Sequence, residues 1–154
     1  MRLRVITWMV AAMLVATNVL AKDFISGTWV LNASKSKYGT GAPPKSQVTE
    51  LEDRDGALHE RVKRVNADGT TTEWDLTVKY GGEYYKVTGD PSRDAVAVKK
   101  VDERTLEVTN KKGNAVTTRM KIVVAPDGKS RTNTVTGTDA NGKAFTSVMV
   151  FDRK

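Results

Sequence analysis

The chain has 154 residues, of which 25 are lysine or arginine and 18 are aspartate or glutamate, so its formal net charge is +7. It contains one histidine and no cysteine, which excludes disulfides, thiolate metal sites, cysteine nucleophiles and multi-histidine metal cages. The length fits one domain, since domains cluster at roughly 100–150 residues.

The first residues, 1–21, have the pattern of a secretory signal peptide. Arg2 and Arg4 form a basic start, a mostly apolar stretch follows, and Ala21 provides a small side chain before a cleavage site. We therefore expect a mature chain of residues 22–154 with a net charge of +5, located in the periplasm or secreted. An uncleaved N-terminal anchor is the alternative.

The remaining chain is divided by tight-turn dipeptides that recur about every 12 to 15 residues, which is typical of an all-β meander. Asn-Gly and Asp-Gly favour hairpins because the central residues of such turns need positive φ. The dipeptides are Asp55-Gly56, Asp68-Gly69, Gly81-Gly82, Gly113-Asn114, Asp127-Gly128 and Asn141-Gly142. The strands predicted between them are 27–32, 47–53, 58–66, 72–80, 83–87, 95–101, 105–110, 116–124, 130–138 and 144–152.

Between the first two predicted strands, residues 33–45 are rich in Ser, Lys, Gly and Pro, and they are predicted to form an irregular loop. Long loops in compact domains are often functional. A plain surface loop tethered by Tyr38 is the alternative.

Apolar and polar side chains alternate along the clearest strands, 72–80 and 116–124, which predicts one buried and one solvated face. We predict an all-β, antiparallel, up-and-down meander of about eight to ten strands closed into a β-barrel, because closure removes exposed sheet edges. A two-sheet β-sandwich is the alternative. The predicted inward-facing set, which would line a ligand cavity or fill the barrel completely, is Trp74, Leu76, Val78, Tyr80, Met120, Ile122, Met149 and Phe151.

Gly27-Thr28-Trp29 resembles the Gly-x-Trp start of the lipocalins and the wider calycin superfamily. Residues 22–154 also resemble an uncharacterised group of small secreted bacterial proteins, with GTW-x-LN near the start and GTDA-x-GK near the end. The last strand is similar to that of fatty-acid-binding-type barrels. The resemblance implies a lipocalin-like barrel whose closed end is plugged by Gly27 and Trp29, with Arg153 packed across the indole, and whose open end admits an apolar small molecule.

Two features of fatty-acid-binding proteins are missing from this sequence. Residues 33–45 are too short and too rich in proline for the helix-turn-helix lid of that family. The Arg-x-Tyr pair that holds a carboxylate is replaced by Met149 and Phe151.

No group of residues predicts catalysis or metal binding. His59 alternates with apolar Leu58 and should face solvent, and Glu73 and Asp75 lie on the polar side opposite Trp74. Two segments that resemble fragments of a calcium loop lack the remaining oxygen ligands of such a site. We therefore predict a protein that is not an enzyme and has neither a metal nor a cofactor.

We predict an exported, monomeric barrel that binds a small hydrophobic or amphipathic molecule. The alternative is a non-enzymatic envelope or interaction protein that uses its basic outer surface around a filled barrel. Basic pairs such as Lys63-Arg64 and Lys99-Lys100 are scattered among acids, so no nucleic-acid partner is expected. Weak contact with anionic envelope components is compatible with the positive charge.

Overall fold

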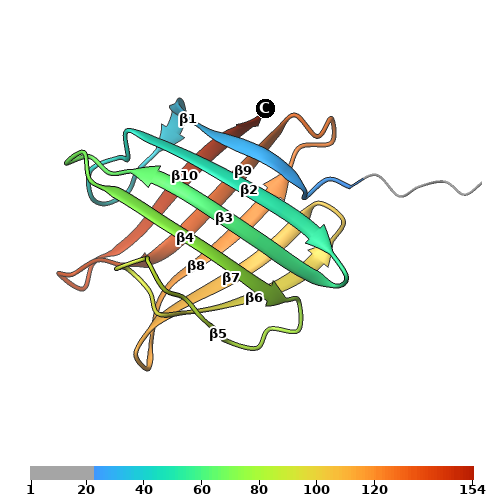
Figure 1. The fold of residues 1–154 in the computed structure, drawn as a ribbon. Helices are drawn as coiled ribbons and strands as arrows, with labels where there is room; N and C mark the ends of the chain where they lie inside the picture. Colours follow the sequence, from blue (N-terminus) through green and yellow to red (C-terminus); the bar gives the residue numbers. More distant parts are fainter. Residues whose placement is uncertain (1–22) are drawn as a thin grey trace, which may run out of the picture.

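The computed structural model describes residues 23–154, so the predicted signal peptide lies outside the described residues. Ten strands and no helix occur in this range (Figure 1), and it accordingly contains no helix that could span a membrane. The strands are β1 Gly27–Lys37, β2 Ser46–Arg54, β3 Ala57–Val65, β4 Thr71–Lys79, β5 Tyr85–Lys86, β6 Ala95–Asp102, β7 Thr105–Lys112, β8 Ala115–Val124, β9 Ser130–Thr138 and β10 Ala144–Arg153.

All ten strands form one antiparallel sheet in the order β4-β3-β2-β1-β10-β9-β8-β7-β6-β5. Strands that are neighbours in sequence pair with each other, except β4 and β5, and β1 pairs with β10. In that pairing Trp29 lies opposite Arg153. The predicted meander barrel is therefore confirmed, and the two-sheet sandwich is not observed.

The sheet order ends at β4 and at the two-residue strand β5, and β4 approaches β6 at a seam that the chain between them covers. An isolated bridge links Gly81, just after β4, to Lys99 of β6. Further along, a Cβ on Gly89 would lie 2.3 Å from the carbonyl oxygen of Glu73, so this loop presses directly on the start of β4. Residues 80–94, which include the short strand β5, thus complete the wall of the barrel (Figure 1).

The first strand is longer than the sequence predicts, because β1 continues to Lys37 instead of ending at residue 32. Its register against β10 shifts between Asn32 and Lys37. The Ser36 hydroxyl bridges this irregularity: it donates to the Asn32 carbonyl at 2.7 Å and accepts the N–H of Val150 at 3.0 Å. Backbone pairing and a hydroxyl, rather than apolar packing, extend the strand, and the irregular connection shrinks to residues 38–45.

Another difference lies at the start of β8, where Val116 does not share the inward face of Met120 and Ile122. The pairing of β7 with β8 shifts register between Asn110 and Lys111. This irregularity reverses the alternation, and Val116 is 42% exposed. Strict alternation along residues 116–124 would place Val116 on the face of Met120 and Ile122, and that expectation is wrong.

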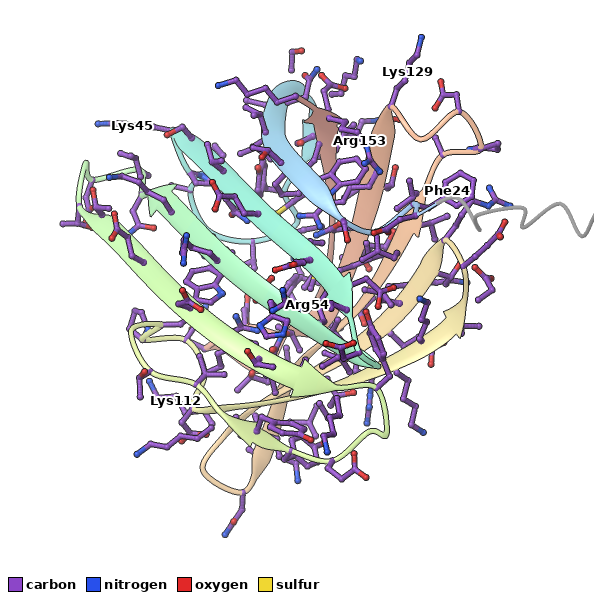
Figure 2. All side chains as sticks on the ribbon, turned by 45° about the vertical axis from the view of Figure 1, so that its right-hand side comes forward. Phe24, Lys45, Arg54, Lys112, Lys129 and Arg153 are labelled. Carbon is purple, nitrogen blue, oxygen red and sulfur yellow. The ribbon has the colours of Figure 1, made fainter. Side chains whose placement is uncertain are left out.

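One end of the barrel is closed by the chain just before β1 and by Arg153. Trp29 is fully buried, and its Nε1 donates to the Ile25 carbonyl at 3.1 Å. The Arg153 guanidinium lies 4.4 Å from the indole centroid and donates to the carbonyls of Phe24, Ser26 and Gly128 at 2.6, 2.6 and 2.7 Å. In Figure 2, Arg153 and Phe24 lie together at this end, away from Lys45.

Gly27 permits this closure for a steric reason. Its φ is +138°, and a Cβ there would approach Nη1 of Arg153 to 2.9 Å. Phe151, Leu106 and Val78 pack behind the indole and are fully buried. The apolar core therefore occupies this closed end of the barrel.

Candidate functional site

At the opposite end, the barrel encloses a cavity of about 520 Å³. Its mouth lies among three loops at the far ends of the strands, formed by residues 38–45, 66–70 and 87–94. Inward-facing side chains of the strands form its walls. The loop 38–45, in which the sequence analysis expected a functional connection, contributes Tyr38, Thr40, Ala42 and Pro44.

A charged wall is formed by β2, β3 and β4. Glu60 and Arg64 of β3 line the cavity, because they share the inward face of Leu58 and Val62. The Arg64 Nε donates to Gln47 Oε1 of β2 at 2.9 Å. Burial lowers the pKa of Arg64 below its ordinary value. The sequence analysis treated Arg64 as a scattered surface charge, and the structure corrects this.

Trp74 of β4 is held between two guanidinium groups on this wall. Arg64 lies 5.1 Å and Arg93 5.0 Å from the ring centroid, which is within the range of cation–π attraction. The indole Nε1 donates to Glu60 at 2.9 Å. The ring is therefore fixed in orientation beside the cavity.

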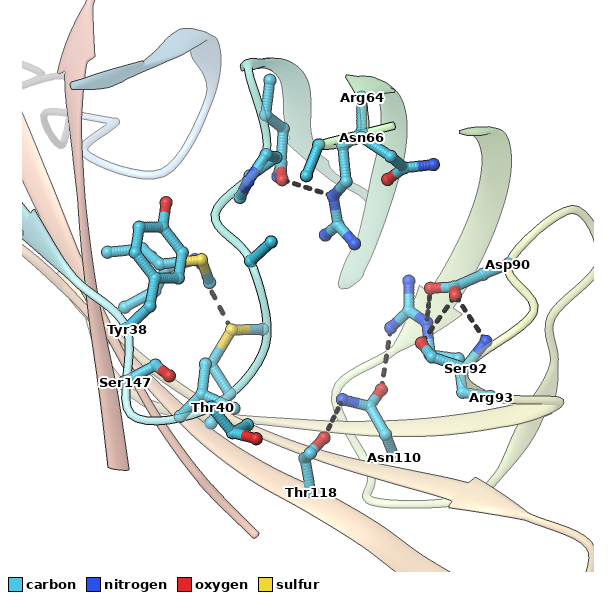
Figure 3. Close-up of a pocket in the computed structure, with 18 of the residues that line it drawn as sticks. Tyr38, Thr40, Arg64, Asn66, Asp90, Ser92, Arg93, Asn110, Thr118 and Ser147 are labelled. Atoms are coloured by element: carbon cyan, nitrogen blue, oxygen red, sulfur yellow. Dashed lines mark hydrogen bonds and ion pairs between the residues drawn. The ribbon is translucent and has the colours of Figure 1, made fainter. Parts of the chain in front are cut away.

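Arg93 anchors the loop 87–94 to the barrel through a set of polar contacts (Figure 3). Its guanidinium contacts Asp90 at 3.0 Å and Glu60 at 3.5 Å, and it donates to Asn110 at 2.8 Å. Asn110 in turn donates to Thr118 at 2.9 Å. Arg93 is thus a buried cation whose charge is balanced by two carboxylates.

The facing wall, formed by β8, β9 and β10, carries the larger apolar side chains of the cavity apart from Trp74. Its side chains include Met120, Val135, Phe145 and Met149. Small polar groups interrupt this wall, such as Ser147, whose hydroxyl accepts the N–H of Gly39 at 3.0 Å. The cavity therefore has a charged side on β2–β4 and a facing side on which apolar side chains are mixed with polar ones.

Arg131 of β9 forms the floor of the cavity, next to the closed end. It is 2% exposed, and its guanidinium lies 4.6 Å from the Phe151 ring and 5.2 Å from the Trp29 ring. Among residues 23–154, its Nε and Nη1 have no hydrogen-bond partner, nor does Oδ1 of the neighbouring Asn133. Burial lowers the pKa of Arg131 to about 10, so the group remains charged at neutral pH.

The structure separates the eight predicted cavity residues into two groups. Trp74, Met120 and Met149 line the cavity. Val78, Ile122 and Phe151 belong to the packed core, and Leu76 and Tyr80 pack against that core. Contact of these residues with a ligand remains a prediction.

Four of the charged lining residues were not expected from the sequence: Glu60, Arg64, Arg93 and Arg131. A signal was present for three of them, because the period-2 alternation from Leu58 places Glu60 and Arg64 inward. The same alternation places Arg131 on the side of Val135. Arg93 lies in a loop, where no periodicity predicts the direction of a side chain.

The outer face carries the other residues weighed for chemistry. His59 Nδ1 lies 2.8 Å from the Thr77 hydroxyl, while Glu73 pairs with Lys63 and Asp75 with Arg61, each at 3.0 Å. In the described part of the chain, no three His, Asp or Glu side chains are grouped as a metal site would require.

Comparison with known proteins shows similarity in structure alone. No family model matches the chain, and no curated protein matches it in sequence. A crystal structure of zebrafish ileal bile acid-binding protein complexed with cholic acid is similar, with a TM-score of 0.54 and 12% sequence identity. The match covers 84% of this chain and 98% of that one. The chain thus shares the antiparallel β-barrel fold of that protein.

Proposed function

We propose that the protein binds a small amphipathic molecule inside its barrel. The cavity of about 520 Å³, open at one end, carries this proposal. Its size lies within the range of roughly 300–1,000 Å³ that is common for small-molecule sites. The similar zebrafish barrel is complexed with cholic acid, which is compatible with the proposal.

The charged wall favours an amphipathic ligand over a wholly apolar one. Arg64 and Glu60 line the cavity on this wall, and an alkane-like ligand would remove their polar atoms from water without replacing the lost hydrogen bonds. A ligand with one polar and one apolar side would instead place its polar groups against β2–β4 and its apolar groups against Met120 and Met149. We propose binding without catalysis.

A cavity-filling variant with a matched control tests the proposal. In Val135→Trp an indole would enter the cavity from β9, whereas Thr136→Trp places the same ring on the outer face, where Thr136 is exposed. The probe is N-phenyl-1-naphthylamine, a neutral dye that fluoresces in apolar surroundings. We expect Val135→Trp to weaken binding at least about tenfold, equivalent to about 1.4 kcal/mol, and Thr136→Trp to leave it unchanged. Equal binding by both variants would contradict the proposal, as would an absence of dye binding by the unaltered protein.

We also propose that the protein is exported and cleaved after Ala21, on the basis of the signal-peptide pattern in residues 1–21. The intact mass of the protein recovered from outside the cytoplasm should correspond to a chain that begins at Lys22. Retention of residues 1–21 on the exported protein would contradict cleavage.

A further inference from the structure

We infer that the floor of the cavity is an anion subsite, in which the Arg131 guanidinium binds the oxyanion of an organic ligand such as a carboxylate, sulfonate or phosphate ester. The inference rests on the proposed function, because it specifies which end of the ligand binds and where. It would make the ligand an organic anion that enters with its charged group first.

The first argument is that Arg131 is a buried charge without a counterion in contact. A buried guanidinium normally lies in a set of charge-assisted hydrogen bonds, because an unpaired charge in the interior is costly. Two of the Arg131 nitrogens, Nε and Nη1, have no partner anywhere in residues 23–154. An oxyanion could accept a charge-assisted hydrogen bond from either of these nitrogens.

The second argument comes from the distribution of charge around the cavity. Both deep carboxylates, Asp90 and Glu60, contact Arg93 at 3.0 and 3.5 Å. The third acidic residue of the lining, Asp68, lies on an exposed turn at the mouth, where it accepts from Thr70 at 2.9 Å. Glu60 attracts Arg131 electrostatically, but neither Glu60 nor Asp90 contacts it, so the guanidinium at the floor has no ion-pair partner in the described residues.

The third argument is that the site is rigid before any ligand binds. Arg131 lies over the rings of Phe151 and Trp29, and Arg153 lies over the same indole at 4.4 Å. Arg153 is fixed by three carbonyl acceptors, so the indole and Arg131 have little freedom to rearrange. Two cations that share one ring repel each other, and an anion at the floor would offset that repulsion.

Two dyes that differ by a single sulfonate group, and therefore in charge, test the subsite. The anion 1-anilinonaphthalene-8-sulfonate has the aromatic body of N-phenyl-1-naphthylamine with an added sulfonate. We expect the protein to bind the sulfonate at least tenfold more tightly than the neutral dye. Arg131→Met should reduce this preference to less than about threefold by weakening sulfonate binding alone.

The control is Arg119→Met, which removes the same charge from an exposed position on the neighbouring strand β8. It should leave the preference unchanged. The inference is overturned if Arg131→Met binds the two dyes as the unaltered protein does. It is also overturned if Arg119→Met has the larger effect, since the sulfonate would then lie on the outer surface. If neither dye enters the cavity, the proposed function itself fails, and that result is distinguishable from the others.

Asn133→Asp keeps the inference testable if Arg131→Met does not fold. Asn133 lies two residues from Arg131 on the same inward face, so a carboxylate there would supply an internal partner for the guanidinium. We expect weaker sulfonate binding, with neutral-dye binding unchanged. Inorganic phosphate should displace the sulfonate dye poorly. Equal displacement by phosphate and by an organic carboxylate would overturn the inference that the ligand is an organic anion.

Discussion

The two ends of the barrel are built from the same strands but differ in what their inward faces carry. At the closed end, the fully buried Trp29, Phe151 and Leu106 fill the interior, and Arg153, which lies over the Trp29 ring, donates to three carbonyls. At the open end, charged and amide side chains surround a cavity of about 520 Å³. Arg131 lies at the boundary between the two ends, against the Trp29 ring on one side and the cavity on the other.

This difference shows that stability and binding are separated along the barrel axis. Apolar burial at the closed end stabilises the fold, since it removes large aromatic surfaces from water. Polar groups that line the cavity stabilise the fold less, and they are better suited to contact a ligand. Substitutions at equivalent residue types in the two ends should therefore have unequal effects.

The largest effect is expected from truncating the two buried tryptophans. Trp29→Ala should lower the free energy of unfolding by about 3–5 kcal/mol, because it leaves a cavity in a packed core. Trp74→Ala should cost about 1–2 kcal/mol less, because Trp74 already borders a hollow. Urea denaturation of both variants measures the difference, and equal losses would mean that the two ends are packed alike.

Two arginines contact the Trp29 ring. Replacing them should change the free energy of unfolding in opposite directions. Arg153→Met leaves three carbonyls without their charged donor and should cost about 3 kcal/mol. Arg131→Met removes an unpaired buried charge and should raise the free energy of unfolding by about 1 kcal/mol. Thermal and urea denaturation at neutral pH, without ligand, measure both changes. A lower free energy of unfolding for Arg131→Met than for the unaltered protein would contradict the account.

The pH dependence of Arg131 has a defined direction. Burial lowers its folded-state pKa to about 10, well below the ordinary value of an arginine side chain. The folded state therefore loses this proton first, so the cost of the buried charge is complete below pH 10 and declines as the pH rises above it. The difference in free energy of unfolding between Arg131→Met and the unaltered protein should therefore become smaller as the pH rises above about 10.

A smaller effect on the free energy of unfolding is expected from a side-chain hydrogen bond at the pairing of β1 with β10. The Asn32 side chain donates to Asp152, and this hydrogen bond, with a contribution from Lys35, lowers the pKa of Asp152 below 3.8. A depressed carboxyl pKa stabilises the fold above the unfolded value, and that stability is lost as the pH falls through the folded value. Asn32→Ala should return the Asp152 pKa toward 3.8 in a carboxyl NMR titration. Asp102, whose pKa is lowered by the Arg104 N–H, is the internal control and should not move.

The sequence predicted the fold closely because turn dipeptides and alternation are local signals. All ten strands were expected, and all are present. The differences arise where distant contacts decide the outcome. Ser36 extends β1 by bonding to Val150, far away in sequence, and a shifted register opposite Asn110 turns Val116 outward.

The site was predicted less completely, because hydrophobic patterning identifies a core more readily than a polar hollow. The apolar set included Trp74, Met120 and Met149, which line the cavity, and also residues that fill the closed end. Charged residues were assigned to the surface by default, which is a sound general rule. Arg64 and Arg131 break it, and only the phase of the alternation could have indicated their inward direction.

Contacts between a bound dye and the barrel test the central claim most directly. In an isotope-edited NOESY spectrum of the complex with N-phenyl-1-naphthylamine, the dye protons should show cross-peaks to the methyl groups of Met120, Val135 and Met149, which line the cavity. Cross-peaks to the exposed Val101 and Val116 should be absent. Cross-peaks confined to those exposed valines would place the dye on the outer surface and would contradict a ligand site inside the barrel.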